Sequence, residues 1–260
     1  MRTCVVVPCY NEACRLDVGI FSDFLRTAPW DLNLLFVDDG SRDQTRSILE
    51  DLVAQNRGGA SLLGLPCNQG KAEAVRRGLQ EALAADAELV GYWDADLATP
   101  LSTIPLFIEL LEAEPAIDAV LGSRIRLLGR RVTRRAARHY LGRCFATVVS
   151  LSLRLPVYDT QCGAKMFRRT EALEQALQKP FGSRWIFDVE LLGRLLDWYR
   201  RHDSKAEARA LYEFPLLQWR EVAGSRITPQ DFLRAAREML DLYLRELRHL
   251  PPPEPGAYSD

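Results

Sequence analysis

The sequence lacks a long apolar run. The longest candidate, residues 145–153, is about half of the roughly 20 residues that a membrane-spanning helix needs. We therefore expect a protein that can touch a membrane without crossing it. The chain begins with a predicted strand in place of a signal peptide, and its six cysteines form no Cys-x-x-Cys pair. These features predict reduced thiols and a cytoplasmic protein.

The sequence also has no excess of charge of either sign. Its 34 lysines and arginines nearly cancel its 35 aspartates and glutamates, which leaves a formal net charge of −1. This balance gives no global signature of a polyanion-binding protein, so we expect no nucleic-acid partner. Charge is nevertheless uneven, because residues 124–143 hold eight arginines and no acid. Such a block is typical of a site for phosphate or an anionic membrane surface, and the alternative is a solvated helix face.

Apolar runs and helical patterns alternate four times in the first half of the chain. The expected strands are 3–7, 32–37, 60–65 and 89–93, and the expected helices are 16–25, 43–55, 71–83 and 100–112. Alternation of this kind predicts an α/β fold with a mostly parallel central sheet flanked by helices. The first strand is followed by Pro8-Cys9-Tyr10 in place of a glycine-rich turn, which disfavours a dinucleotide-binding oxidoreductase. The length of 260 residues fits one large domain of this class.

Polar clusters follow each of these strands at its carboxyl end. They are residues 8–12, 38–41, 70–71 and 94–96. Ligands of open α/β sheets bind beyond the carboxyl ends of the strands, so the four clusters are expected to form one site.

Asp94 and Asp96 are the strongest metal-ligand candidates in this set. Residues i and i+2 of an extended chain point to the same side, so both carboxylates can face one crevice. Two like charges at that distance repel unless a cation lies between them. Mg²⁺ or Mn²⁺, which takes one or two protein carboxylates and completes its shell with substrate phosphate, fits this pair. The alternative is a solvated strand end at which Asp96 begins a turn.

Several motifs together resemble a known family. They are residues 6–12 (VVPCYNE), 37–45 (VDDGSRDQT), 68–71 (NQGK), 94–96 (DAD), 122–124 (GSR), 159–167 (DTQCGAKMF), 187–190 (FDVE) and 219–226 (WREVAGSR). In this order they resemble the family 2 inverting glycosyltransferases of the GT-A fold, in the branch of dolichyl-phosphate glucosyltransferases and mannosyltransferases. The resemblance covers about residues 3–245.

The resemblance implies a division of the chain and a set of site residues. It implies one GT-A domain at 1–250, with a nucleotide-sugar-binding half at 1–123 and an acceptor-binding half at 124–250; the proline-rich residues 251–260 are expected to be disordered. The implied nucleotide-sugar residues are Pro8, Tyr10, Asn11, Glu12, Asp39, Ser41, Lys71, Asp94, Ala95, Asp96 and Arg226, with Asp96 and Asp94 as metal ligands. Arg124, Arg138 and Gln161 are implied acceptor residues, and Asp188, Arg124 and Asp94 are the catalytic candidates.

Together these observations predict an enzyme that moves a hexose, with inversion, from a nucleotide diphosphate sugar to a polyprenyl or dolichyl phosphate. UDP-glucose is the favoured donor and GDP-mannose the next, with Mg²⁺ or Mn²⁺ as cofactor. The predicted location is cytoplasmic, peripheral on the cytoplasmic face of the membrane. Two alternatives stay open: a soluble sugar or polysaccharide acceptor, for which Asp188 would serve as general base, and a catalytically silent nucleotide-sugar-binding or membrane scaffold protein. The sequence does not indicate an oligomeric state.

Overall fold

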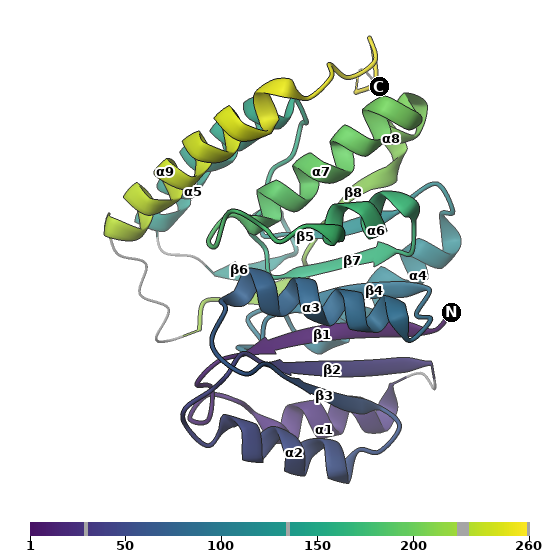
Figure 1. Ribbon diagram of the computed structural model, residues 1–260, viewed down its shortest axis with the longest axis vertical. Helices are drawn as coiled ribbons and strands as arrows, with labels where there is room; N and C mark the ends of the chain where they lie inside the picture. The colour runs from purple at the N-terminus through teal and green to yellow at the C-terminus, as the bar shows by residue number, and fades with distance from the viewer. Residues whose placement is uncertain (29–30, 134–135, 223–228, 259–260) are drawn as a thin grey trace.

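A seven-stranded sheet forms the centre of the molecule (Figure 1). The computed structural model describes residues 1–28, 31–133, 136–222 and 229–258 of the chain. The strands are β1 (Thr3–Cys9), β2 (Leu32–Asp38), β3 (Ala60–Gly64), β4 (Leu89–Trp93), β5 (Ala119–Ser123), β7 (Ala164–Arg168) and β8 (Leu211–Pro215). Their order in the sheet is β3-β2-β1-β4-β7-β5-β8, and β7 alone in this order runs antiparallel to both neighbours. The predicted mostly parallel sheet is confirmed.

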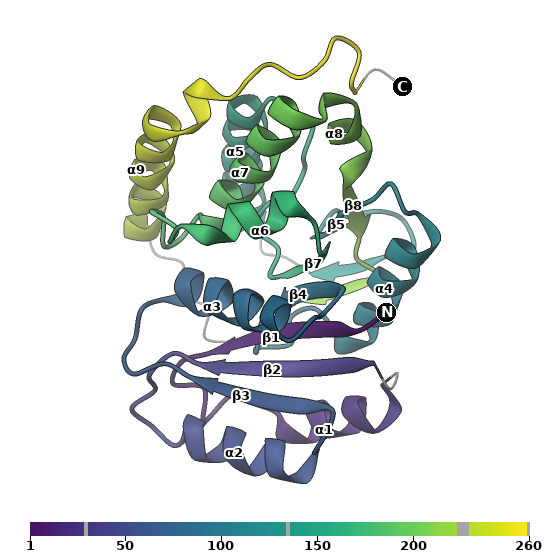
Figure 2. The same ribbon diagram turned by 45° about the vertical axis from the view of Figure 1, so that its right-hand side comes forward.

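Helices cover both faces of this sheet. They are α1 (Val18–Thr27), α2 (Thr45–Gln55), α3 (Lys71–Ala84), α4 (Ile104–Ala113), α5 (Ala136–Leu153), α6 (Glu171–Gln178), α7 (Phe187–His202), α8 (Ser204–Ala210) and α9 (Pro229–Arg245). Phe21 of α1, Leu49 of α2 and Phe107 of α4 belong to one apolar core. Leu79 of α3 and Leu195 of α7 belong to the other. Figures 1 and 2 show α5, α7 and α9 together at one end of the molecule, and α7 packs on the sheet.

The first strand, β1, is apolar at successive positions because both of its faces are buried. Val5 and Val7 pack in one core and Val6 packs in the other, and none of the three is exposed. A strand covered on both faces needs apolar side chains at successive positions, as residues 3–7 provide. The register places β1 between β2 and β4, so that the carboxyl ends of these strands meet at one edge.

The second half of the chain adds a small parallel sheet of β6 (Arg131–Thr133) and β9 (Gln218–Arg220). Both α5 and α9 bury one side and expose apolar residues on the other: Val148 and Leu151 on α5, and Leu233, Leu240, Tyr243 and Leu244 on α9. Within the described ranges, no helix has the length and apolar character to span a bilayer.

The end of the chain packs against a buried ion pair. Arg200 and Glu207 are both fully buried and lie 2.7 Å apart. Arg200 donates to the Pro251 carbonyl at 3.1 Å, and the Tyr258 hydroxyl donates to Glu207 at 2.5 Å. A disordered tail was expected at 251–260; residues 251–258 instead supply partners that this buried pair requires.

Candidate functional site

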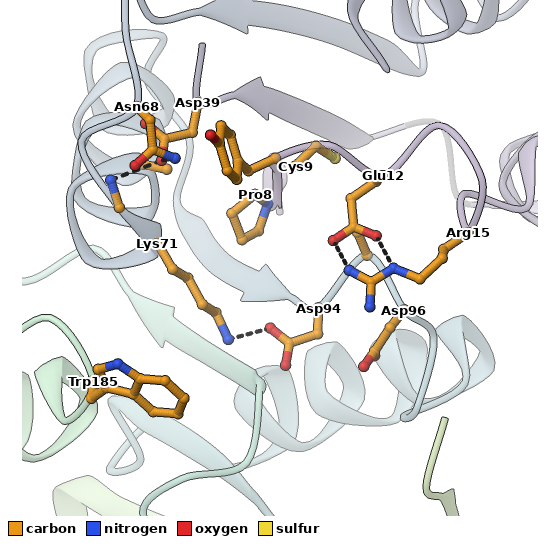
Figure 3. Close-up of a pocket in the computed structure, with 14 residues that line it drawn as sticks. Pro8, Cys9, Glu12, Arg15, Asp39, Asn68, Lys71, Asp94, Asp96 and Trp185 are labelled. Carbon is orange, nitrogen blue, oxygen red and sulfur yellow. Dashed lines mark hydrogen bonds and ion pairs between the residues drawn. The ribbon is translucent and has the colours of Figure 1, made fainter. Parts of the chain in front are cut away.

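A cavity of about 640 Å³ opens at the sheet edge where β1, β2 and β4 end (Figure 3). Of the residues expected to bind a nucleotide sugar, Pro8, Tyr10, Glu12, Asp39, Lys71, Asp94, Ala95 and Asp96 line it. The other lining residues are Cys9, Arg15, Asn68, Gly70, Ala74 and Trp185. The structure therefore brings together segments that follow four different strands, β1, β2, β3 and β4.

Lys71 and Asp94 form an ion pair across the middle of the cavity. Lys71 is the first residue of α3, and its Nζ lies 2.5 Å from Oδ1 of Asp94, which directly follows β4. Burial alone would lower the pKa of Lys71, but the Asp94 and Asp188 carboxylates outweigh it and raise the pKa. The ammonium therefore stays charged at the start of α3, and a helix start is a favourable place for phosphate.

Gly163 allows Asp94 to take this position. The Asp94 amide donates to the Gly163 carbonyl at 2.9 Å, and a Cβ added to Gly163 would lie 1.9 Å from Oδ2 of Asp94. The carboxylate thus lies where any side chain at position 163 would have to be. The glycine of the 159–167 motif is explained by this close approach.

Asp96 lies two residues after Asp94 and accepts from the Ala98 amide at 3.0 Å. Burial and the neighbouring Asp94 raise the pKa of Asp96. Burial also raises the pKa of Glu12, despite a two-point contact with Arg15 at 2.9 and 2.6 Å. The cavity therefore holds carboxylates whose charged forms are poorly compensated by the protein alone.

This deficit fits a divalent cation. In the described part of the chain no group of three or more His, Cys, Asp or Glu side chains could hold a metal without further ligands. Mg²⁺ and Mn²⁺ are commonly bound by one or two carboxylates together with substrate phosphate. Asp94 and Asp96 supply that number of carboxylates, next to Lys71, which suits the phosphate.

Asp39 shapes the other end of the cavity. Its carboxylate accepts from the amides of Gln69 and Gly70, each at 2.8 Å, and from the Asn68 side chain at 3.0 Å. Burial raises the pKa of Asp39 in spite of these amide donors. Asp39 thus holds the loop that leads into α3, across a sequence distance of about 30 residues.

Asn11 and Ser41 do not line the cavity. The Asn11 amide donates to the Ser41 hydroxyl at 3.1 Å, and the Asn11 side chain accepts from the Arg42 amide at 2.9 Å. These contacts tie the loops after β1 and β2 together. Both residues therefore support the loops that line the cavity without lining it themselves.

Arg124 and Gln161 lie outside the cavity lining. Arg124 makes a two-point contact with Asp159 at 2.6 and 2.7 Å and lies over the Trp219 ring at 5.4 Å. Burial would lower the pKa of Arg124, but Asp159 raises it. The Gln161 Nε2 is buried and has no hydrogen-bond partner in the structure as described. Arg138 lies in α5 with its side chain outside the described part, and Arg226 lies outside the described residues.

Asp188 is buried beside the cavity and does not line it. It was expected to point into the crevice, but its Oδ1 accepts from Lys165 Nζ at 2.6 Å and from the Tyr92 hydroxyl. Lys165 is fully buried on β7 and also donates to the Cys162 carbonyl at 2.6 Å. Burial and then the Asp188 charge raise the pKa of Tyr92 well above its usual value. The physical reason for the inward position of Asp188 is that a buried ammonium requires a counterion.

Arg15 and Trp185 line the cavity but were not assigned from the sequence. Arg15 follows Glu12 by three residues, so the turn in that loop brings the pair together. Trp185 precedes the 187–190 motif by two residues, and this proximity is the only signal for it in the sequence. Its place at the cavity depends on contacts with distant parts of the chain.

Comparisons with known proteins show the family to which this chain belongs. The family model described as "Glycosyl transferase family 2" matches residues 4–174. The dolichyl-phosphate beta-glucosyltransferase of Drosophila melanogaster is 32% identical over 94% of this chain and 74% of that protein. The human protein of the same name is 29% identical over 94% of this chain and 75% of its own.

Solved glycosyltransferase structures share the fold. The mannosyltransferase PcManGT from Pyrobaculum calidifontis, in complex with GDP-Man and Mn²⁺, aligns with a TM-score of 0.68 at 22% identity, over 98% of this chain and 67% of that one. Glucosyl-3-phosphoglycerate synthase from Mycobacterium tuberculosis, in complex with Mn²⁺, UDP and glucosyl-3-phosphoglycerate, aligns with a TM-score of 0.63 at 23% identity, over 98% and 81%. The chain belongs to glycosyl transferase family 2 and has the GT-A fold.

Proposed function

We propose that this protein transfers glucose from UDP-glucose, with inversion, to a polyprenyl or dolichyl phosphate. The family assignment supports glycosyl transfer, and the names of the Drosophila and human relatives support glucose and a dolichyl-phosphate acceptor. GDP-mannose is the second candidate donor. The single observation that carries the acceptor class is the buried ion pair of Asp188 with Lys165.

The acceptor argument rests on proton removal. A sugar hydroxyl must lose a proton as it attacks, so a carboxylate has to reach it. The Asp188 side chain is only 7% exposed and is held by Lys165 and Tyr92. A lipid phosphate is already anionic and attacks without a base. The position of Asp188 therefore favours a phosphate acceptor over the soluble sugar or polysaccharide alternative.

The residues that line the cavity support a proposed place for each part of the donor. Pro8, Tyr10 and Asp39 line the cavity, and the nucleoside is proposed to bind beside them. The Lys71 ammonium is proposed to contact the diphosphate. Asp94 and Asp96 would hold Mg²⁺ or Mn²⁺, which when bound stabilises the negative charge that builds on the departing diphosphate. Attack from the face opposite the diphosphate inverts the anomeric carbon.

The acceptor is proposed to enter from the second half of the chain. Arg124 lies at the start of the arginine block, and its contact with Asp159 fixes the plane of the guanidinium. Gln161 and Arg138 are proposed to share the acceptor phosphate, and Arg226 to close over the donor diphosphate. The arginine block and the apolar residues of α5 fit an anionic membrane surface.

The test is release of nucleoside diphosphate from UDP-glucose and from GDP-mannose, with Mg²⁺ or Mn²⁺. Each donor is measured without acceptor, with a polyprenyl phosphate in detergent, and with 3-phosphoglycerate as a soluble phosphate. We expect release from UDP-glucose that requires the lipid and the metal and is lost in Asp96→Ala. Lipid-independent release would overturn the lipid acceptor. Donor binding without release under any condition would favour the silent binding protein.

A further inference from the structure

An exposed tryptophan lies at the cavity without an assigned role. Trp185 is in the segment between α6 and α7, lines the cavity, and is 42% exposed. Figure 3 shows it on the far side of the Lys71–Asp94 pair from Asp39 and Pro8. A large aromatic ring beside so polar a cavity leaves apolar area in water. A ligand that covers the ring would remove that area from water.

The backbone at Trp185 is held in place by a different part of the chain. The amides of Arg184 and Trp185 both donate to one carboxylate oxygen of Glu238, at 3.1 and 2.9 Å. Glu238 lies on α9, where the next residue, Met239, is buried in the core. A single charged acceptor for two successive amides is a strong hydrogen-bonding arrangement.

A second contact ties the same segment to the start of α3. The Arg184 side chain reaches the Gln69 carbonyl at 3.4 Å, and a Cβ added to Gly70 would lie 3.2 Å from the guanidinium. The segment that carries Trp185 is therefore attached both to α9 and to the loop that precedes Lys71. The ring is presented to the cavity from a fixed backbone.

The order of groups along the cavity indicates what the ring meets. With the nucleoside at Asp39 and the diphosphate at Lys71, the next group of the donor is the hexose, on the side where Trp185 lies. A hexopyranose has polar edges and an apolar face of C–H groups. The indole offers an apolar surface for that face, and Asp94 offers a polar partner for the hydroxyls.

We propose that Trp185 forms the apolar wall of the hexose subsite and that Glu238 is a positioning residue that holds it there. The inference rests on the proposed function, because it takes the donor to be a nucleotide sugar. It adds a contact specific to the sugar, which the nucleotide alone does not make.

The test compares binding of UDP and UDP-glucose to the full chain by calorimetry, with Mn²⁺ present. If the hexose covers about 50 Å² of the ring, Trp185→Ala should weaken UDP-glucose about tenfold. The affinity of Trp185→Ala for UDP should stay within about twofold of the wild-type affinity, because UDP has no hexose to cover the ring. Trp185→Phe retains a flat aromatic surface and should keep most of the wild-type preference for UDP-glucose over UDP.

Glu238 is tested by the same pair of ligands. Glu238→Ala should reduce the preference for UDP-glucose over UDP, as Trp185→Ala does. Glu238→Gln keeps an acceptor oxygen and should retain the wild-type preference. Asp241→Ala is the matched control on α9, because that carboxylate is exposed and pairs only loosely with Arg237 at 4.0 Å. Thermal unfolding of each variant shows whether a loss of affinity reflects a loss of folding.

The outcomes separate this inference from the proposed function. Equal weakening of UDP and UDP-glucose in Trp185→Ala, or no change in either, overturns the hexose wall while the proposed function stands. If the wild type binds GDP and GDP-mannose instead, the same comparison is made with that pair. Failure of the wild type to bind any of these ligands overturns the proposed function itself.

Discussion

Replacement of Lys165 by methionine should destabilise the protein strongly. The Lys165 side chain is 1% exposed and that of Asp188 is 7% exposed, with 2.6 Å between Nζ and Oδ1. Methionine fills a similar volume but leaves Asp188 as a buried charge whose remaining hydrogen-bond donor, among the described residues, is the Tyr92 hydroxyl. Removal of one partner of a buried pair costs about 3–5 kcal/mol. Because Tyr92 still donates, we expect about 3 kcal/mol, at the low end of that range.

Urea unfolding followed by circular dichroism measures this loss as a lower transition midpoint at an unchanged slope. Lys179→Met is the matched control, because Lys179 is exposed and the same substitution there should cost no more than about 0.5 kcal/mol. The double variant Lys165→Met/Asp188→Leu should recover most of the stability, since no unpaired charge is left.

The reasoning is refuted if Lys165→Met costs as little as Lys179→Met. That result would mean that Lys165 does not hold Asp188 in solution. Asp188 would then be free to act as a base, and the argument for an anionic acceptor would lose its main support.

Three further predictions concern the cavity and the end of the chain. Asp96→Asn should abolish metal-dependent turnover and raise the thermal midpoint of the metal-free protein at pH 7. Because burial and Asp94 raise the pKa of Asp96, its ionisation destabilises the fold, and this gain should disappear as the pH falls below about 4, the ordinary aspartate pKa. Gly163→Ala should lower turnover about 100-fold by displacing Asp94, whereas Gly142→Ala should not, because no described residue outside the backbone of its own helix lies within 4 Å of the added Cβ. Tyr258→Phe should lower the free energy of unfolding by about 2 kcal/mol in urea titrations, because it removes a donor to the buried Glu207 carboxylate, and should leave turnover unchanged.

The local parts of the fold could be predicted from the sequence. The strands β1, β2 and β4 are apolar runs buried on both faces, β3 is partly buried, and each following helix has one apolar side, so the alternation was visible without any long-range information. The carboxyl ends of parallel strands meet at one edge, which is why the cavity contains most of the residues expected from the motifs.

The rest depends on contacts between distant segments. No local pattern shows that β7 inserts antiparallel between β4 and β5, opposite Tyr92. That insertion places Lys165 beside Asp188, which lies 23 residues away in sequence, and so makes this catalytic candidate half of a buried ion pair. Trp185 is held by Glu238, 53 residues away. Side-chain partners of this kind follow from tertiary packing and leave no periodic signal in the sequence.

The most direct test of the account is the structure of the product. Purified protein is incubated with UDP-glucose, Mn²⁺ and a polyprenyl phosphate, and the lipid fraction is analysed by mass spectrometry and by proton NMR of the anomeric centre. The account predicts a polyprenyl phosphate that carries one glucose in the β configuration, opposite to that of the donor. An α-linked product would contradict inversion, and a glucosylated water-soluble product without glucosylated lipid would contradict the proposed acceptor.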